Sequence, residues 1–238
     1  MIKNSKNYII GTSHFGAYLS VKEVEKILFR ASELEIRLID TSPMYGNKNA
    51  EAIIGKQEKK NNLEFQYYSK VGLEGFKKNK FFHVKKTKLN LKNITKSVDE
   101  TLLRLKNDYL DILQLHAFDH TTPLADTLFA IEKLIKCGKI KNYGVCNYDL
   151  TETKKLIRFV EKNNFIKPYS SQVHYNFIER KAEKKILPLL KKKKLKFLLI
   201  EYFLWGFFLA SITIIIDFLK TVEPVKAKEY QNISTNKR

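Results

Sequence analysis

Short apolar runs alternate with amphipathic stretches along most of the chain. Runs of three to seven residues that are rich in Ile, Leu, Val and Tyr predict β-strands. They lie at 8–10, 36–39, 63–69, 109–115, 140–145, 171–173 and 196–200. Between them, apolar residues recur at helical spacing, as in Val24, Leu28 and Ala31 after the capping-box pair Ser20 and Glu23. Further helices are predicted at 94–105, 123–137 and 151–160.

This alternation predicts the fold class. Strand–helix units of roughly 25–35 residues imply parallel strands joined by right-handed crossovers. Their number favours a closed TIM-type (β/α)8 barrel over an open doubly wound sheet. The first strand ends at Gly11-Thr12 and is not followed by Gly-x-Gly-x-x-Gly, which weakens the case for an open dinucleotide-binding sheet.

Composition and charge limit the number of domains and the classes of partner that the chain is expected to have. The chain has 238 residues, 44% of them hydrophobic, which suits one domain with a sizeable core. The net charge of +19 comes from lysines spread over predicted solvent-facing helix surfaces, so we interpret it as a solvated surface and not a nucleic-acid interface. The two cysteines, Cys137 and Cys146, lack metal-type spacing, and the first residues lack a secretory pattern. A cytoplasmic protein without a metal site is expected.

Ionisable residues follow three successive predicted strands. Asp40 follows the second strand, with Tyr45 five residues later, and Lys70 and His116 follow the third and fourth. Taken singly, each has a more ordinary structural role, such as a turn former or a buried, hydrogen-bonded histidine. Because active sites of such barrels lie at the carboxyl ends of the strands, we expect these four residues to converge on one site.

These side chains suit one type of chemistry. A tyrosine, with an ordinary pKa near 10, donates its proton poorly at neutral pH unless a nearby cation stabilises the phenolate. Lys70 could supply that charge, Asp40 could pair with Lys70, and His116 could hydrogen-bond a substrate oxygen. The group would then protonate a carbonyl oxygen while hydride reaches the carbon.

Several segments resemble the aldo-keto reductase family, in family order and spacing, up to about residue 180. They are IIGTSHFG, LIDTSPMYGNKNAEAIIGK, YYSKVG, SVDETLLRLKNDYLDILQLHAFD, GKIKNYGVCNY and SQVHYNFIER. The resemblance implies reversible NADPH-linked reduction of a small aldehyde or ketone, with Asp40, Tyr45, Lys70 and His116 as the catalytic tetrad and Tyr45 as the proton donor. The sequence leaves NADH open as the cofactor, because no residue that would contact a 2′-phosphate is identifiable.

The resemblance also implies a set of cofactor-binding residues. Asn147 and Gln172 match family residues that hold the nicotinamide carboxamide, and Gly11 and Thr12 match the turn beside the nicotinamide. Tyr202, or alternatively Trp205, is a candidate for stacking on the nicotinamide ring. Cys146 stands where the family usually has serine, and a thiol is the weaker hydrogen-bond donor.

The C-terminal part departs from the family pattern. No phosphate-binding segment is recognisable after residue 196, and the pattern is about one strand–helix unit shorter than that of the family, so the barrel is expected to lack or replace its last unit. The apolar run 212–216 is a candidate closing strand. We assign 1–219 to the barrel and 220–238 to a polar tail. The alternative is a truncated, weakly active or inactive remnant that serves as a binding or interaction module.

Residues 197–216 contain a single charge, Glu201, and are long enough to span a membrane. Because the barrel needs a buried strand and helix at this place in the chain, we favour a core segment over a membrane anchor. The expected ligand is a small carbonyl compound, and the oligomeric state is left open.

Overall fold

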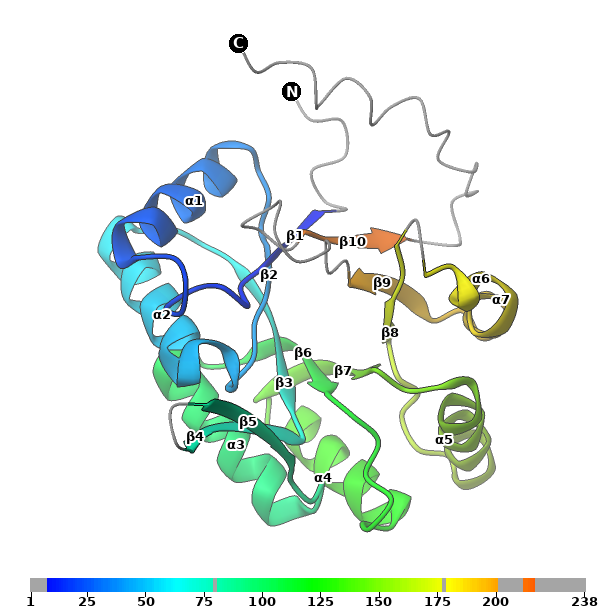
Figure 1. Cartoon of the computed structure of the whole chain (residues 1–238). Helices are drawn as coiled ribbons and strands as arrows, with labels where there is room; N and C mark the ends of the chain where they lie inside the picture. Colours follow the sequence, from blue (N-terminus) through cyan, green and yellow to red (C-terminus); the bar gives the residue numbers. More distant parts are fainter. Residues whose placement is uncertain (1–7, 79–80, 177–178, 201–211, 217–238) are drawn as a thin grey trace.

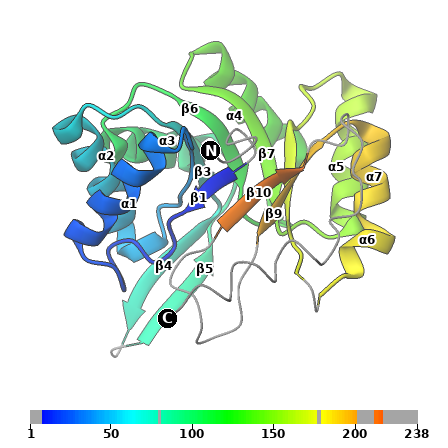
Figure 2. The same ribbon diagram turned by 90° about the horizontal axis from the view of Figure 1, so that it is seen from above.

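A computed structural model describes residues 8–78, 81–176, 179–200 and 212–216. Eight strands form a closed barrel in the order β1-β10-β9-β8-β7-β6-β3-β2 (Figures 1 and 2). Their bounds are Tyr8–Gly11 (β1), Leu38–Asp40 (β2), Gln66–Val71 (β3), Leu110–Leu115 (β6), Ile140–Cys146 (β7), Ser170–His174 (β8), Lys196–Ile200 (β9) and Ile212–Ile216 (β10). The predicted barrel and its seven predicted strands are therefore confirmed.

The closing strand, β10, differs from the other seven. Those seven pair in parallel, whereas β10 runs antiparallel to both of its neighbours, with Thr213 opposite Ile9 on β1 and opposite Ile200 on β9. Only residues 201–211 separate β9 from β10. A parallel crossover needs a dozen or more residues, usually including a helix, while an antiparallel neighbour needs far fewer. The last unit of the predicted barrel is thus replaced by one reversed strand.

Helices cover the outside of the barrel. They are Val21–Glu33 (α1), Asn49–Asn61 (α2), Leu91–Leu105 (α3), Leu124–Lys136 (α4), Leu150–Asn163 (α5), Lys181–Lys185 (α6) and Leu187–Lys193 (α7). The capping box predicted at Ser20 and Glu23 begins α1, and a second one, Asp149 with Glu152, begins α5. Each pair satisfies backbone N–H groups that the first helical turn leaves without partners.

The sequence pattern did not predict α2 or the hairpin formed by β4 (Leu73–Lys78) and β5 (Phe81–Lys86). Helix α2 buries polar side chains as well as apolar ones, which hides the usual two-faced pattern. Glu51 is fully buried there, and Glu58 accepts hydrogen bonds from the Tyr67 hydroxyl and the Phe65 N–H. The hairpin pairs only with itself, so its strands need no continuous apolar run.

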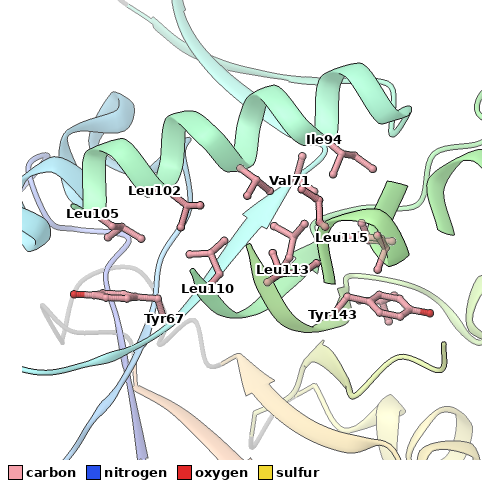
Figure 3. Close-up of a cluster of buried hydrophobic side chains, with 14 of the residues drawn as sticks. Tyr67, Val71, Ile94, Leu102, Leu105, Leu110, Leu113, Leu115 and Tyr143 are labelled. Carbon is pink, nitrogen blue, oxygen red and sulfur yellow. The ribbon is translucent and has the colours of Figure 1, made fainter. Parts of the chain in front are cut away.

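The core has an outer and an inner part. Between the barrel and its helices, α3 packs against β3 and α4 packs against β7, and Figure 3 shows buried side chains of this layer, among them Ile94, Leu102, Val71, Leu113 and Tyr143. Inside the barrel lies a smaller apolar cluster of Ile9, Leu38, Tyr68, Ile112 and Leu198. Because side chains alternate along a strand, the residues two positions further along β2, β3 and β6 also point inward. Those residues are Asp40, Lys70 and Gln114.

The apolar segment 197–216 contributes β9 and β10 at its two ends. Within the described parts of the chain, no helix has the length and apolar character needed to cross a membrane. Residues 201–211 and the tail predicted for 220–238 lie outside the described residues, so the domain boundary at 219 stays a prediction.

Candidate active site

A buried ion pair lies at the carboxyl end of the barrel. The Lys70 Nζ donates to Asp40 Oδ1 at 2.6 Å and to the Thr41 carbonyl oxygen at 2.9 Å. Both side chains are almost inaccessible, at 1% for Lys70 and 6% for Asp40. An ammonium group this buried needs a countercharge and hydrogen-bond acceptors. The Thr41 contact had no sequence signal, because any residue offers a backbone carbonyl.

Tyr45 comes from the loop after β2 and begins the short 3₁₀ helix Tyr45–Lys48. The Lys70 Nζ lies 5.0 Å from the centre of the Tyr45 ring. The Tyr45 ring also meets the His116 ring edge to face, with the ring centres 6.5 Å apart. The phenol is therefore close to both the buried ammonium and the imidazole, as the spacing of the residues in the sequence predicted.

His116 follows β6 and is held by its backbone, whose N–H donates to the Val71 carbonyl at 2.8 Å. Burial, together with the smaller effect of the positive charge of Lys70, lowers the pKa of His116 to about 3. The imidazole is therefore neutral at physiological pH. Within the described residues its Nδ1 has no hydrogen-bond partner. A neutral imidazole has one N–H donor and one acceptor, so it can bind a carbonyl oxygen without adding charge.

Two residues that the sequence assigned to the nicotinamide lie next to this group. The Gln172 Nε2 donates to Asp40 Oδ2 at 3.3 Å, while its Oε1 has no partner in the part of the chain that the structure describes. The Asn147 Nδ2 donates to the His116 carbonyl at 3.0 Å, and the Asn147 N–H donates to the Gln172 carbonyl. The two amides are thus tied to each other and to the tetrad.

Thr12, which follows β1, holds the backbone at Asp40. Its hydroxyl and its backbone N–H both donate to the Asp40 carbonyl, at 3.0 and 3.1 Å. Gly11, the last residue of β1, lies opposite Asp40 in the parallel pairing. Tyr202 and Trp205, the candidate stacking residues, fall outside the described residues.

Cys146 precedes Asn147 and is fully buried beside the ion pair. The pKa of its thiol is raised to about 12, mainly by burial, with the positive charge of Lys70 opposing the rise and the negative charge of Asp40 adding to it. Its Sγ contacts the Asn147 Nδ2 at 3.2 Å. A thiol that stays protonated is no nucleophile, so this residue acts as a neutral neighbour of the carboxamide pair.

A second buried charge supports β3 from outside the barrel. Glu51 on α2 accepts hydrogen bonds from the Ser69 hydroxyl at 2.7 Å and the Arg104 Nε at 2.8 Å. Ser69 is the residue before Lys70, so this contact ties the strand that carries the lysine to α2 and α3. The sequence pattern gave no separate signal for this role, because Glu51 resembles any helix-surface carboxylate.

Comparison with known proteins agrees with this geometry. The sequence model of the Aldo/keto reductase family matches residues 8–235, nearly the whole chain. The chain belongs to the aldo/keto reductase family. Aldo-keto reductase YhdN from Bacillus subtilis (strain 168) is 32% identical over 194 residues, an alignment that covers 81% of this chain and 55% of that protein.

Solved structures of aldo/keto reductases share the barrel. A glycerol dehydrogenase from Gluconobacter oxydans superposes with a TM-score of 0.69 and 26% identity, over 80% of this chain and 58% of that one. An aldo/keto reductase from Klebsiella pneumoniae, solved in complex with NADP and acetate, gives a TM-score of 0.65 and 26% identity, over 79% and 62%. The chain thus spans little more than half the length of these relatives.

Proposed function

We propose that the protein is an NADPH-dependent reductase of small aldehydes or ketones, with Tyr45 as the proton donor. The observation that carries this proposal is the position of the Lys70 ammonium, which is bonded to Asp40 at 2.6 Å and lies 5.0 Å from the centre of the Tyr45 ring. A fixed, desolvated cation beside a phenol favours the phenolate that remains after proton transfer.

The cofactor assignment rests on family membership and on one unpaired buried acceptor. Gln172 is fully buried, and its Oε1, which has no partner among the described residues, suits the amide N–H of a nicotinamide carboxamide. Gln172 and Asn147 would hold that carboxamide, with Gly11 and Thr12 beside the ring. When bound, NADPH supplies the hydride. The NADP complex of the Klebsiella pneumoniae relative supports this choice over NADH.

Each tetrad residue has a distinct role in the proposed reaction. Tyr45 gives its proton to the carbonyl oxygen, and the Lys70 charge stabilises the phenolate that is left. Asp40 and the Thr41 carbonyl hold the ammonium in place through two hydrogen bonds. His116 is neutral and orients the substrate oxygen, so the proton comes from the phenol and not from an imidazolium.

Tyr45→Phe tests this assignment, because it removes the hydroxyl and keeps the ring. NADPH oxidation with a panel of aldehydes should be slower by about 10²–10⁴-fold, the usual contribution of a general acid, while NADPH binding is retained. Tyr109→Phe is the matched control. A lysine also lies over that ring, with the Lys141 Nζ 4.1 Å from the ring centre, but Tyr109 directly precedes the amino end of β6. Unchanged turnover in Tyr45→Phe would exclude the phenol as the proton donor.

A second candidate function follows from the reversed closing strand. The chain covers only 55% of the Bacillus subtilis relative, and β10 replaces the expected last strand–helix unit. A barrel of this kind could bind nucleotide weakly and serve as an interaction module without turnover. Fluorescence titration separates the two proposals. Micromolar binding of NADPH supports the reductase, and no binding up to millimolar NADPH supports the non-catalytic module.

A further inference from the structure

A row of polar residues crosses the inside of the barrel next to Lys70. In the parallel pairing, Lys70 on β3 lies opposite Gln114 on β6, Gln114 lies opposite Gly144 on β7, and Gly144 lies opposite Ser170 on β8. Residues paired in this way point to the same face of a sheet, and adjacent strands are only about 4.8 Å apart. The lysine, the amide and the hydroxyl are therefore neighbours inside the barrel.

Gln114 and Ser170 are fully buried. Within the described parts of the chain, neither the Nε2 nor the Oε1 of Gln114 has a hydrogen-bond partner, and the Ser170 hydroxyl has none either. A buried polar group without a partner costs about 1–3 kcal/mol. An apolar side chain would avoid that cost, as Ile112 does one inward position earlier on the same strand.

Gly144 shows that these polar atoms converge on one point. A Cβ placed on Gly144 would lie 2.3 Å from the Ser170 Oγ and 2.5 Å from the Gln114 Oε1. Because the Ser170 Oγ and the Gln114 Oε1 both lie so close to this Cβ position, they are neighbours. Gly144 has no side chain to separate them. A single water, with hydrogen bonds of about 2.8 Å to each oxygen, can bridge them. Buried waters typically make two to four such bonds.

We propose that Gln114 and Ser170 form an internal water-binding site beside Lys70, and that Gln114 is a positioning residue for the Lys70 side chain. The bound water satisfies the amide and the hydroxyl. It also keeps the space beside the lysine filled with a polar neighbour, which holds the ammonium against Asp40 and near the Tyr45 ring. The positioning role rests on the proposed reductase function, whereas the water site does not.

The water site is tested by a crystal structure of the full chain at a resolution that shows ordered water. We expect a peak within hydrogen-bonding distance of both the Gln114 amide and the Ser170 Oγ in the parent protein. The peak should be lost in Ser170→Ala and retained in Ser171→Ala. Ser171 is the matched control because it is also a fully buried serine, but it is the next residue along β8 and faces the opposite side of the sheet. An empty site, or a protein group bonded directly to Gln114, would overturn this part.

The positioning role is tested by kinetics of Gln114→Leu, which keeps the side-chain bulk and removes the amide. We expect kcat to fall about 10-fold, the KM for NADPH to stay unchanged, and the pH profile of kcat to move by about half a unit or more, because the charge beside the proton donor is less well held. Gln114→Asn, which keeps a neutral amide, should retain more of kcat than Gln114→Leu. Circular dichroism of each variant checks that it folds.

The tests of the water site and of the positioning role can fail independently of the test of the proposed reductase function. A Gln114→Leu variant with parental kcat and pH profile, alongside an inactive Tyr45→Phe, would refute the positioning role and leave the reductase assignment intact. A parent protein without reductase activity would refute the proposed function and the positioning role together. The crystallographic comparison of Ser170→Ala with Ser171→Ala would still decide the water site.

Discussion

The buried pair of Lys70 and Asp40 makes a quantitative prediction about stability. Asp40→Asn keeps the shape of the side chain but removes the charge that lies 2.6 Å from the Lys70 Nζ. With the lysine side chain only 1% exposed, bulk solvent does not reach the ammonium to replace the lost countercharge. Removing one member of a buried pair typically destabilises a protein by about 3–5 kcal/mol, because the other charge is left uncompensated.

Urea denaturation measures this effect. With a slope of about 2–3 kcal/mol per molar urea, the unfolding midpoint of Asp40→Asn should fall by about 1–2 M. Asp99→Asn is the control, because the Lys139 Nζ and Asp99 Oδ1 are also 2.6 Å apart, but those side chains are 38% and 47% exposed. Exposed pairs contribute about 0–1 kcal/mol, so the control midpoint should barely change.

A double variant completes the test. Lys70→Met combined with Asp40→Asn removes both charges, so no buried charge is left unpaired, and its cost should be clearly smaller than the sum of the two single costs. Equal midpoint shifts for Asp40→Asn and Asp99→Asn, or strictly additive costs in the double variant, would refute the view that burial makes this pair important.

Two further predictions concern His116 and Gly55. Burial lowers the pKa of His116 to about 3 in the folded protein, whereas an unfolded histidine titrates near 6.5, so the unfolded chain binds more protons between these values. The free energy of unfolding should therefore fall by about 2 kcal/mol from pH 7 to pH 5. His116→Asn should lose this pH dependence. If the variant keeps it, the lowered pKa of His116 is not its cause. At Gly55, an added Cβ would lie 2.5 Å from backbone atoms of Arg104 and Leu105, so Gly55→Ala should cost about 1–3 kcal/mol. Thermal melting checks this against Lys56→Ala at the exposed neighbouring position, and a stabilised Gly55→Ala would show that α2 does not approach α3 so closely.

The sequence by itself determined the seven parallel strands, most of their covering helices and the order of the tetrad. Those features rest on local periodicity and on the rule that polar residues after successive parallel strands meet at one end of the barrel. The sequence therefore places Asp40, Lys70 and His116 at or next to the carboxyl ends of their strands, and the structure has them within one residue of those ends.

Tertiary structure decided what local patterns do not encode. The direction of β10 depends on the two free edges of β1 and β9 and on the short connection between them. Helix α2 was hidden because Glu51 is buried against Arg104, which lies far away in the sequence. The row of Gln114, Gly144 and Ser170 exists only through strand register. In each case the deciding contact joins residues distant in the chain, and such contacts leave no periodic trace in the sequence.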